Sequence, residues 1–305
     1  MLSFIIRRLL LVIPMALIAV TVTWGLIRIA PGNFYSSEKN LPPAIEKNIR
    51  EKYGLDKHWV QQYGIMMWNV IKLDFGESLK FEGQSVNGMI ARHFPYSATI
   101  GFFAYLLALV IGLIAGIIAA LKQNSAFDYG SMAMAMLGLS VPSFVLGPLL
   151  VLVFSLWLYL FPPARWGGIL ALILPIVTLS ASYAAYIARL TRAGMLEVMR
   201  SDYIRTARAK GLDEKTVLLK HALRGGIIPV VSFTGPALAG LLAGTVVVEK
   251  VFAIPGLGNI FIQAVLNRDE PVILGIVAFL SILVMVFNLA VDISYGFLDP
   301  RIRYE

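Results

Sequence analysis

Long apolar segments, free of charged residues and histidine, alternate along this chain with more polar segments. Crossing the hydrocarbon core of a bilayer takes about 20 residues of α-helix. Six segments can do so, namely residues 9–27, 98–121, 129–160, 166–188, 225–248 and 272–291. The third is too long for one straight span. The pattern predicts an all-α membrane protein with six transmembrane helices, which places both termini on the same side.

The lysines and arginines between these segments indicate which side that is, because positive residues collect in short cytoplasmic loops. Residues 189–224 carry nine lysines and arginines against four acidic residues, whereas residues 249–271 carry two against three. We therefore predict that both termini are cytoplasmic. The expected organisation is a cytoplasmic N-terminus with the first helix (1–30), an extracytoplasmic segment (31–97), a five-helix core (98–298) containing the 189–224 loop, and a cytoplasmic tail (299–305).

The composition excludes other classes of protein. Of the 305 residues, 58% are hydrophobic and 14% are charged, whereas soluble domains are about one quarter charged. A soluble enzyme and a disordered chain are therefore excluded. The chain has no cysteine, so it has no disulfide framework and no thiolate metal site. The first apolar segment is long for a signal peptide and no good cleavage site follows it, so we expect an uncleaved helix.

The extracytoplasmic segment is predicted to contain two short helices. Residues 42–54 begin with proline, end with glycine and repeat apolar residues at helical spacing. A second helix is marked by Val60, Tyr63, Met67, Val70 and Ile71. It is too short to span and is expected at the membrane surface. The segment is either a structural cap or a docking surface for a partner.

The sequence contains no site for chemistry. The predicted spans lack charged residues and histidine, and the nearest exception is Asp292, at the cytoplasmic end of the sixth, whereas ion-coupled carriers hold acidic or histidine relays near the midplane. No phosphate-binding loop motif is present. Residues 74–76 spell Asp-Phe-Gly without the other kinase signatures, and the Gly-rich turn at 255–258 lacks a preceding strand. His58, His93 and His221 have no ligand spacing. We predict no catalytic, cofactor-binding or metal-binding residues, and no enzyme activity.

Glycine and proline interrupt several predicted spans. The pairs Gly112/Gly116 and Gly240/Gly244 allow close helix contact, and they are interpreted as packing sites or, alternatively, as hinges. Prolines lie within or at the ends of the apolar segments, where neighbouring helices can satisfy the backbone. They are Pro14, Pro142, Pro148, Pro175, Pro229 and Pro236.

The 189–224 loop is longer than two neighbouring helices need. Residues 201–213 predict a short helix, capped by Ser201 or Asp202 and ended by Gly211, and residues 213–223 predict a second. The loop supplies most of the net charge of +8. It is therefore expected to bind either a groove of a partner protein or anionic lipid headgroups, and not nucleic acid.

The chain resembles the permease subunits of ABC importers. The sequence from Asp202 to Leu212 (DYIRTARAKGL), followed by Lys220-His221-Ala222-Leu223 and Pro229, is similar to their coupling loop. It looks like the dipeptide/oligopeptide/nickel branch, and within it the B-type oligopeptide permeases. Further matching motifs are Arg7–Leu10, Arg28–Gly32, Asp74–Ser78, Val141–Phe144, Ile254–Gly258, Leu266–Asp269 and Asp299–Tyr304.

The resemblance implies a type I ABC importer permease fold in a bacterial inner membrane, importing oligopeptides with ATP-Mg bound in partner subunits. It implies a second permease subunit, two ATPase subunits and an extracytoplasmic substrate-binding protein, besides membrane lipid. The ATPase contact would be made by Ser201, Asp202, Tyr203, Ile204, Arg205, Thr206, Ala207, Arg208, Ala209, Lys210, Gly211 and Leu212, with Ala207 and Gly211 most sensitive to size.

This loop departs from the general coupling motif of the superfamily. Arg205-Thr206-Ala207 stands where the motif has Glu-Ala-Ala, and the later isoleucine and proline positions hold His221 and Arg224. Any contact that needs the glutamate is therefore in doubt. Alternatives for the function are import of dipeptides, glutathione or nickel, or an ion-coupled carrier or channel.

Overall fold

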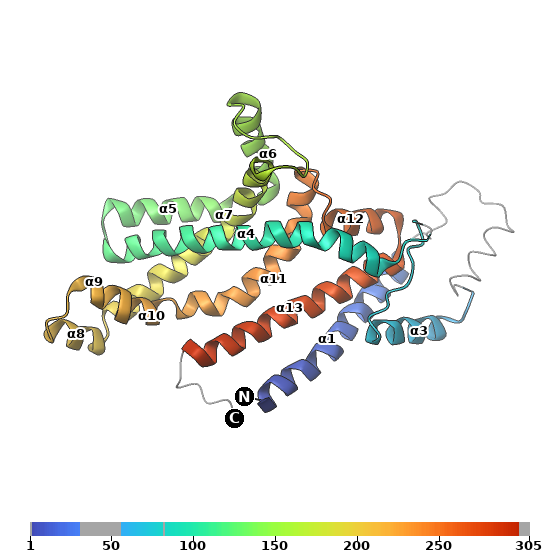
Figure 1. The fold of residues 1–305 in the computed structure, drawn as a ribbon, viewed down its shortest axis with the longest axis horizontal. Helices are drawn as coiled ribbons and strands as arrows, with labels where there is room; N and C mark the ends of the chain where they lie inside the picture. The colour runs from blue at the N-terminus through green and yellow to red at the C-terminus, as the bar shows by residue number, and fades with distance from the viewer. Residues whose placement is uncertain (1, 31–55, 82, 299–305) are drawn as a thin grey trace. The chain divides into compact units, whose positions relative to one another are not determined.

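The computed structural model describes residues 2–30, 56–81 and 83–298, which form helices joined by turns and loops, with one isolated bridge between Glu77 and Ser85 (Figure 1). They form two compact units, one within residues 1–95 and 256–285 and the other within 96–255 and 286–305. The elements are α1 (Leu2–Ile29), α3 (Trp59–Ile71), α4 (Val86–Leu121), α5 (Ala126–Ser140), α6 (Ser143–Leu150), the π-helix η2 (Val151–Trp157), α7 (Ile169–Met199), α8 (Asp202–Ala209), α9 (Glu214–Thr216), the π-helix η3 (Val217–Ala222), α10 (Leu223–Gly226), α11 (Ile228–Val251), α12 (Leu257–Asn267) and α13 (Glu270–Leu298).

The six predicted spans correspond to helices in the described residues. Parts or all of α1, α4, α7 and α13 are long and apolar enough to cross a membrane, and two bent helix pairs bring the number to six if each pair is one span. The short helix marked by Val60 to Ile71 is α3, so that prediction is confirmed. The helix predicted over 42–54 lies outside the described residues.

Both bends lie beside prolines. Between α5 and α6 the chain turns by 104°, and Val141 is extended, with φ −91° and ψ 112°. A residue that precedes proline avoids the helical region, so Pro142 ends α5. The second bend, 47°, precedes α11, which has Pro229 in its first turn. The over-long third apolar segment is thus a broken helix.

The central helix of the second unit is α7. It contacts α5, α6, α10 and α11, and its buried face is rich in small residues. A Cβ at Gly112 of α4 would lie 2.6 Å from Ile187, and one at Gly116 would lie 2.6 Å from the carbonyl oxygen of Ala188. Both distances are too short for any side chain. The packing interpretation of this glycine pair is confirmed, because the α4 backbone lies directly against α7 at both positions.

In the first unit, a buried carboxylate fastens the loop between α3 and α4 to the start of α13. Asp269 is 1% exposed. Its oxygens accept hydrogen bonds from the Ser78 hydroxyl, from the Leu79 amide at 3.0 Å and from the Lys80 amide at 3.3 Å. Phe75 packs among the apolar side chains of the same unit. The Asp-Phe-Gly triplet is therefore part of a structural turn.

Candidate functional site

The predicted coupling helix is α8, which follows α7 after a short turn (Figure 1). Ser201 is its N-cap residue by backbone conformation, although its hydroxyl donates backwards to the Val198 carbonyl. At the other end the Gly211 amide donates to the Arg208 carbonyl and the Leu212 amide to the Ala207 carbonyl. This pair of bonds is a Schellman motif, which needs a left-handed residue. Gly211 has φ +77°, so its backbone conformation explains the glycine.

One face of α8 packs onto the second unit. Ile204 is 0% exposed and Ala207 is 6% exposed. They belong to a cluster with Met195 of α7 and with Val217 and Ala222 of η3. The spacing of three residues places both side chains on one face of the helix. Ala207 is therefore small because it lies against the chain's own core, whereas the sequence predicted its size to matter for a partner.

The opposite face of α8 is exposed and polar. Arg205 pairs with Asp202 at 2.5 Å, and Arg208 makes two hydrogen bonds to Glu214, at 2.7 and 3.2 Å. Tyr203 is 50% exposed. The other predicted contact residues on this surface are Thr206, Ala209, Lys210, Gly211 and Leu212. Ten of the twelve predicted residues thus remain at least partly accessible to a partner, and Ile204 and Ala207 do not.

The second predicted helix is also present, and it continues further than residue 223. Asp213 caps α9 by accepting a hydrogen bond from the Thr216 amide at 3.1 Å. Hydrogen bonds from Thr216 hold the pKa of Asp213 below its ordinary value. The helix then passes through η3, whose wider turns are typical of functional sites, and through α10. This helix returns the chain from α8 to α11.

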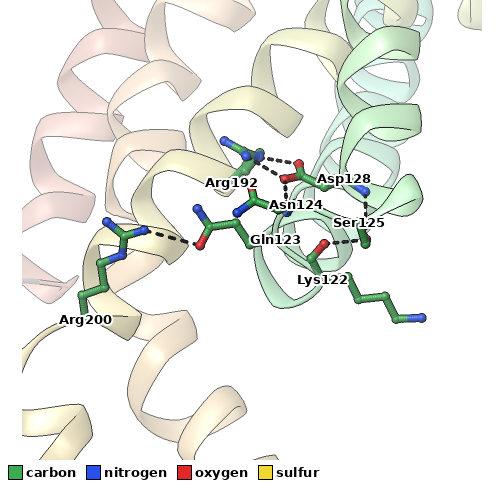
Figure 2. A network of polar contacts seen from close by, with 7 residues as sticks. All are labelled: Lys122, Gln123, Asn124, Ser125, Asp128, Arg192 and Arg200. Carbon is green, nitrogen blue, oxygen red and sulfur yellow. Dashed lines mark hydrogen bonds and ion pairs between the residues drawn. The ribbon is translucent and has the colours of Figure 1, made fainter.

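An ion pair between a buried aspartate and a half-buried arginine lies beside this site and was not predicted. Asp128, at the start of α5, is 1% exposed. The Arg192 guanidinium of α7 donates to both its carboxylate oxygens, at 2.6 and 2.7 Å. The Asn124 amide donates to the same carboxylate at 3.0 Å. Figure 2 shows how Arg192 points to Asp128 from the neighbouring helix.

The same network extends from Asp128 towards α8. The Arg200 side chain, at the end of α7, donates to Gln123 at 3.4 Å, and Ser125 donates to the Lys122 carbonyl at 2.5 Å (Figure 2). A bidentate arginine–carboxylate pair fixes both position and orientation. The turn between α4 and α5 is therefore fastened to the part of α7 that leads into α8. The site as a whole is a polar surface that is held firmly to the rest of the second unit.

Known proteins resemble the chain over most or all of its length. A family described as "Binding-protein-dependent transport system inner membrane component" matches residues 112–304. The oligopeptide transport system permease protein OppB of Haemophilus influenzae is 44% identical, and that of Escherichia coli strain K12 is 43% identical, each over 100% of both chains. The dipeptide transport system permease protein DppB of Bacillus subtilis is 41% identical over 99% of this chain and 98% of its own.

Solved structures share the fold. Two inward-facing structures of the MetNI methionine ABC transporter align with TM-scores of 0.57 and 0.59, at 20% identity, over 69% of this chain and 96% of the matched chain. The all-helical fold predicted for the chain, that of type I ABC importer permeases, is thereby confirmed.

Proposed function

The chain belongs to the family of binding-protein-dependent transport system inner membrane components, and on that premise we propose that it is the permease subunit of an ATP-driven importer of oligopeptides. The relatives that are named for oligopeptide transport match it from end to end. The proposal places the chain in a bacterial inner membrane with both termini in the cytoplasm. ATP-Mg is bound and hydrolysed by two separate ATPase subunits.

The single observation that carries this proposal is the arrangement of α8. Its inner face is buried in the chain's own core and its outer face presents charged and small residues. A short helix of this kind fits a groove on another protein. Closure of the ATPase subunits would move α8, and the buried contacts of Ile204 and Ala207 would pass that movement to α7. A second permease subunit and an extracytoplasmic binding protein complete the importer.

Uptake into proteoliposomes tests this function. Proteoliposomes that contain the purified complex should take up labelled oligopeptides under two conditions only. ATP must be present on the side of the membrane that holds the ATPase subunits, and the binding protein must be present on the opposite side. The chain reconstituted alone should take up no peptide when a gradient of protons or of another ion is applied. Gradient-driven uptake by the isolated chain would show an ion-coupled carrier instead.

Two substitutions of Gly211 test the docking role of α8. Gly211→Trp should leave membrane insertion intact and abolish uptake, because the indole projects from the docking surface, where a side chain meets no atom of this chain. Gly211→Asn is the matched control, since asparagine tolerates the left-handed conformation at φ +77°. Normal uptake by the tryptophan variant would exclude the coupling role, and loss of uptake in both variants would assign Gly211 to backbone geometry alone.

A dipeptide importer is the second candidate, because the Bacillus subtilis relative is named for dipeptide transport. Glutathione and nickel are further alternatives within the same family. Stimulation of ATP hydrolysis by dipeptides, longer peptides, glutathione and nickel, each with the cognate binding protein, distinguishes these substrates.

A further inference from the structure

A hollow of about 580 Å³ lies in the second unit between α5 and α7. Its walls are mainly apolar and come from Met132 and Met136 on α5 and from Leu190 and Ala193 on α7, with Tyr186 also lining it. Arg189 and Arg192 line it as well. The docking role proposed for α8 does not use this hollow.

The deepest part of the hollow is apolar. The contacts of Arg192 with Asp128, and of Gly138 with Ala181, show that α5 and α7 run antiparallel. Met132 and Met136 follow Asp128 by four and eight residues, which is about 6 and 12 Å along the axis. On α7, which runs the other way, Arg192 lies beside Asp128 and Arg189 lies about 4.5 Å further into the predicted span, with Leu190 between them. Met136 and Tyr186 therefore line the part of the hollow nearest the middle of the predicted span.

The two arginines differ in their partners. The Arg192 guanidinium is bound to the buried carboxylate of Asp128. Arg189 is exposed and has no acidic partner among the described residues. The hollow thus presents one uncompensated positive charge and, further towards the middle of the predicted span, the apolar surface of Met136 and Tyr186. This order of charge and apolar surface matches a molecule with an anionic head and a hydrocarbon tail.

We propose that this hollow binds an anionic phospholipid, with the headgroup phosphate on Arg189 and an acyl chain along Met132 and Met136. The assignment rests on the proposed membrane orientation, which puts Arg189 at the cytoplasmic surface. That leaflet is rich in anionic lipids, and basic pockets between helices on this side bind their headgroups. The bound acyl chain of the lipid would cover the apolar wall beside the Asp128–Arg192 pair.

Native mass spectrometry of the intact complex tests the site. The complex is purified from nanodiscs of mixed phosphatidylcholine and phosphatidylglycerol, and the retained phosphatidylglycerol is counted. Arg189→Gln should reduce retention about fivefold, the usual effect of one basic residue at a membrane surface. Lys122→Gln is the matched control, because it removes an exposed lysine outside the hollow and should retain as much lipid as the wild type.

A second pair of variants tests the apolar wall without changing charge. Ala193→Trp fills the hollow and should also reduce retention, whereas Ala133→Trp places the same ring on an exposed position of α5 that does not line it. Unchanged retention in both Arg189→Gln and Ala193→Trp would overturn the proposal. So would a cross-link from Ala193→Cys to another subunit, which would make the hollow a protein interface. Lipid retention is read without transport, so failure of peptide uptake would count against the proposed function and not against this site.

Discussion

Two segments outside the long helices are held in different ways. The loop between α3 and α4, here called the anchored loop (residues 72–81 and 83–85), is held by polar bonds to the buried carboxylate of Asp269. The coupling segment (residues 201–212) is held by the two apolar side chains of Ile204 and Ala207. The anchored loop buries Ser78 and Leu79, whereas the coupling segment leaves most of its polar groups exposed.

On the proposed function, the difference separates a structural segment from a docking segment. Buried groups that satisfy one another inside the molecule, as Ser78, Leu79 and Asp269 do, are not available to a partner. A helix fastened by its apolar face alone keeps its charged side chains available for another protein. Both segments carry sequence motifs of the same family, so the motifs alone do not distinguish these two roles.

Removing the carboxylate should have the largest effect on stability. Asp269→Ala leaves the buried Leu79 amide without its acceptor, and each buried polar group left unsatisfied costs about 1–3 kcal/mol. We expect a loss of about 3 kcal/mol, measured as thermal unfolding of the purified complex. Asp74→Ala, which removes an exposed carboxylate of the same loop, is the control and should change stability little. Equal effects would contradict the anchoring role.

Truncating a side chain on the inner face of α8 should have the second-largest effect on stability. Ile204→Ala should cost about 2 kcal/mol, the lower end for a buried isoleucine, because the short helix can settle into the space. Amide hydrogen exchange in residues 202–209 should quicken and peptide-stimulated ATP hydrolysis should fall. Thr206→Ala, on the exposed face, should leave exchange nearly unchanged. A comparable loss of protection in that variant would mean that the two faces are not distinct.

A substitution on the outer face should uncouple transport without unfolding the chain. Arg208→Ala breaks an exposed ion pair with Glu214, and such pairs contribute less than about 1 kcal/mol. Peptide-stimulated ATP hydrolysis should nevertheless drop, since the guanidinium belongs to the docking surface. If thermal unfolding shifts as far as it does in Ile204→Ala, the outer face is structural and the comparison with the anchored loop fails.

The smallest effect should be a dependence on pH at the cap of α9. The folded pKa of Asp213 lies below its ordinary value because Thr216 donates hydrogen bonds to the carboxylate. Its contribution is therefore present above the ordinary pKa of aspartate and is lost as the pH falls through the folded value. Amide exchange at Thr216 should accelerate in acid in the wild type, and it should already be fast at neutral pH in Asp213→Ala.

The sequence predicted the features that depend on local patterns. Apolar segments located the spans, Pro142 accounts for the break in the third, and small residues with Gly211 located α8. The spacing of Ile204 and Ala207 also contained the signal for the buried face, although it was interpreted as a contact with a partner. Local patterns alone could not pair Asp128 with Arg192, because 64 positions separate them.

The Asp269 anchor was missed for the same reason. Ser78 lies 191 positions from Asp269, and in the sequence Asp269 is one acid of a loop between two spans and the last residue of a family motif, neither of which gives it a partner. Burial changes its meaning, since a buried carboxylate must be surrounded by donors. Which donors surround it depends on how distant helices pack, and neither hydrophobic periodicity nor charge counting encodes that.

The glycine contacts between α4 and α7 have a consequence for movement during transport. Side chains between two helices can change rotamer and let the helices slide or roll in small steps. At Gly112 and Gly116 the α4 backbone lies against the carbonyl oxygens of Ala184 and Ala188 and against the β-branched side chains of Ile187 and Thr191, and a close-packed contact of this kind does not deform gradually. The two helices must therefore travel together. Spin labels on their outward faces near these glycines should keep one separation through every state of the cycle, even while labels elsewhere change theirs.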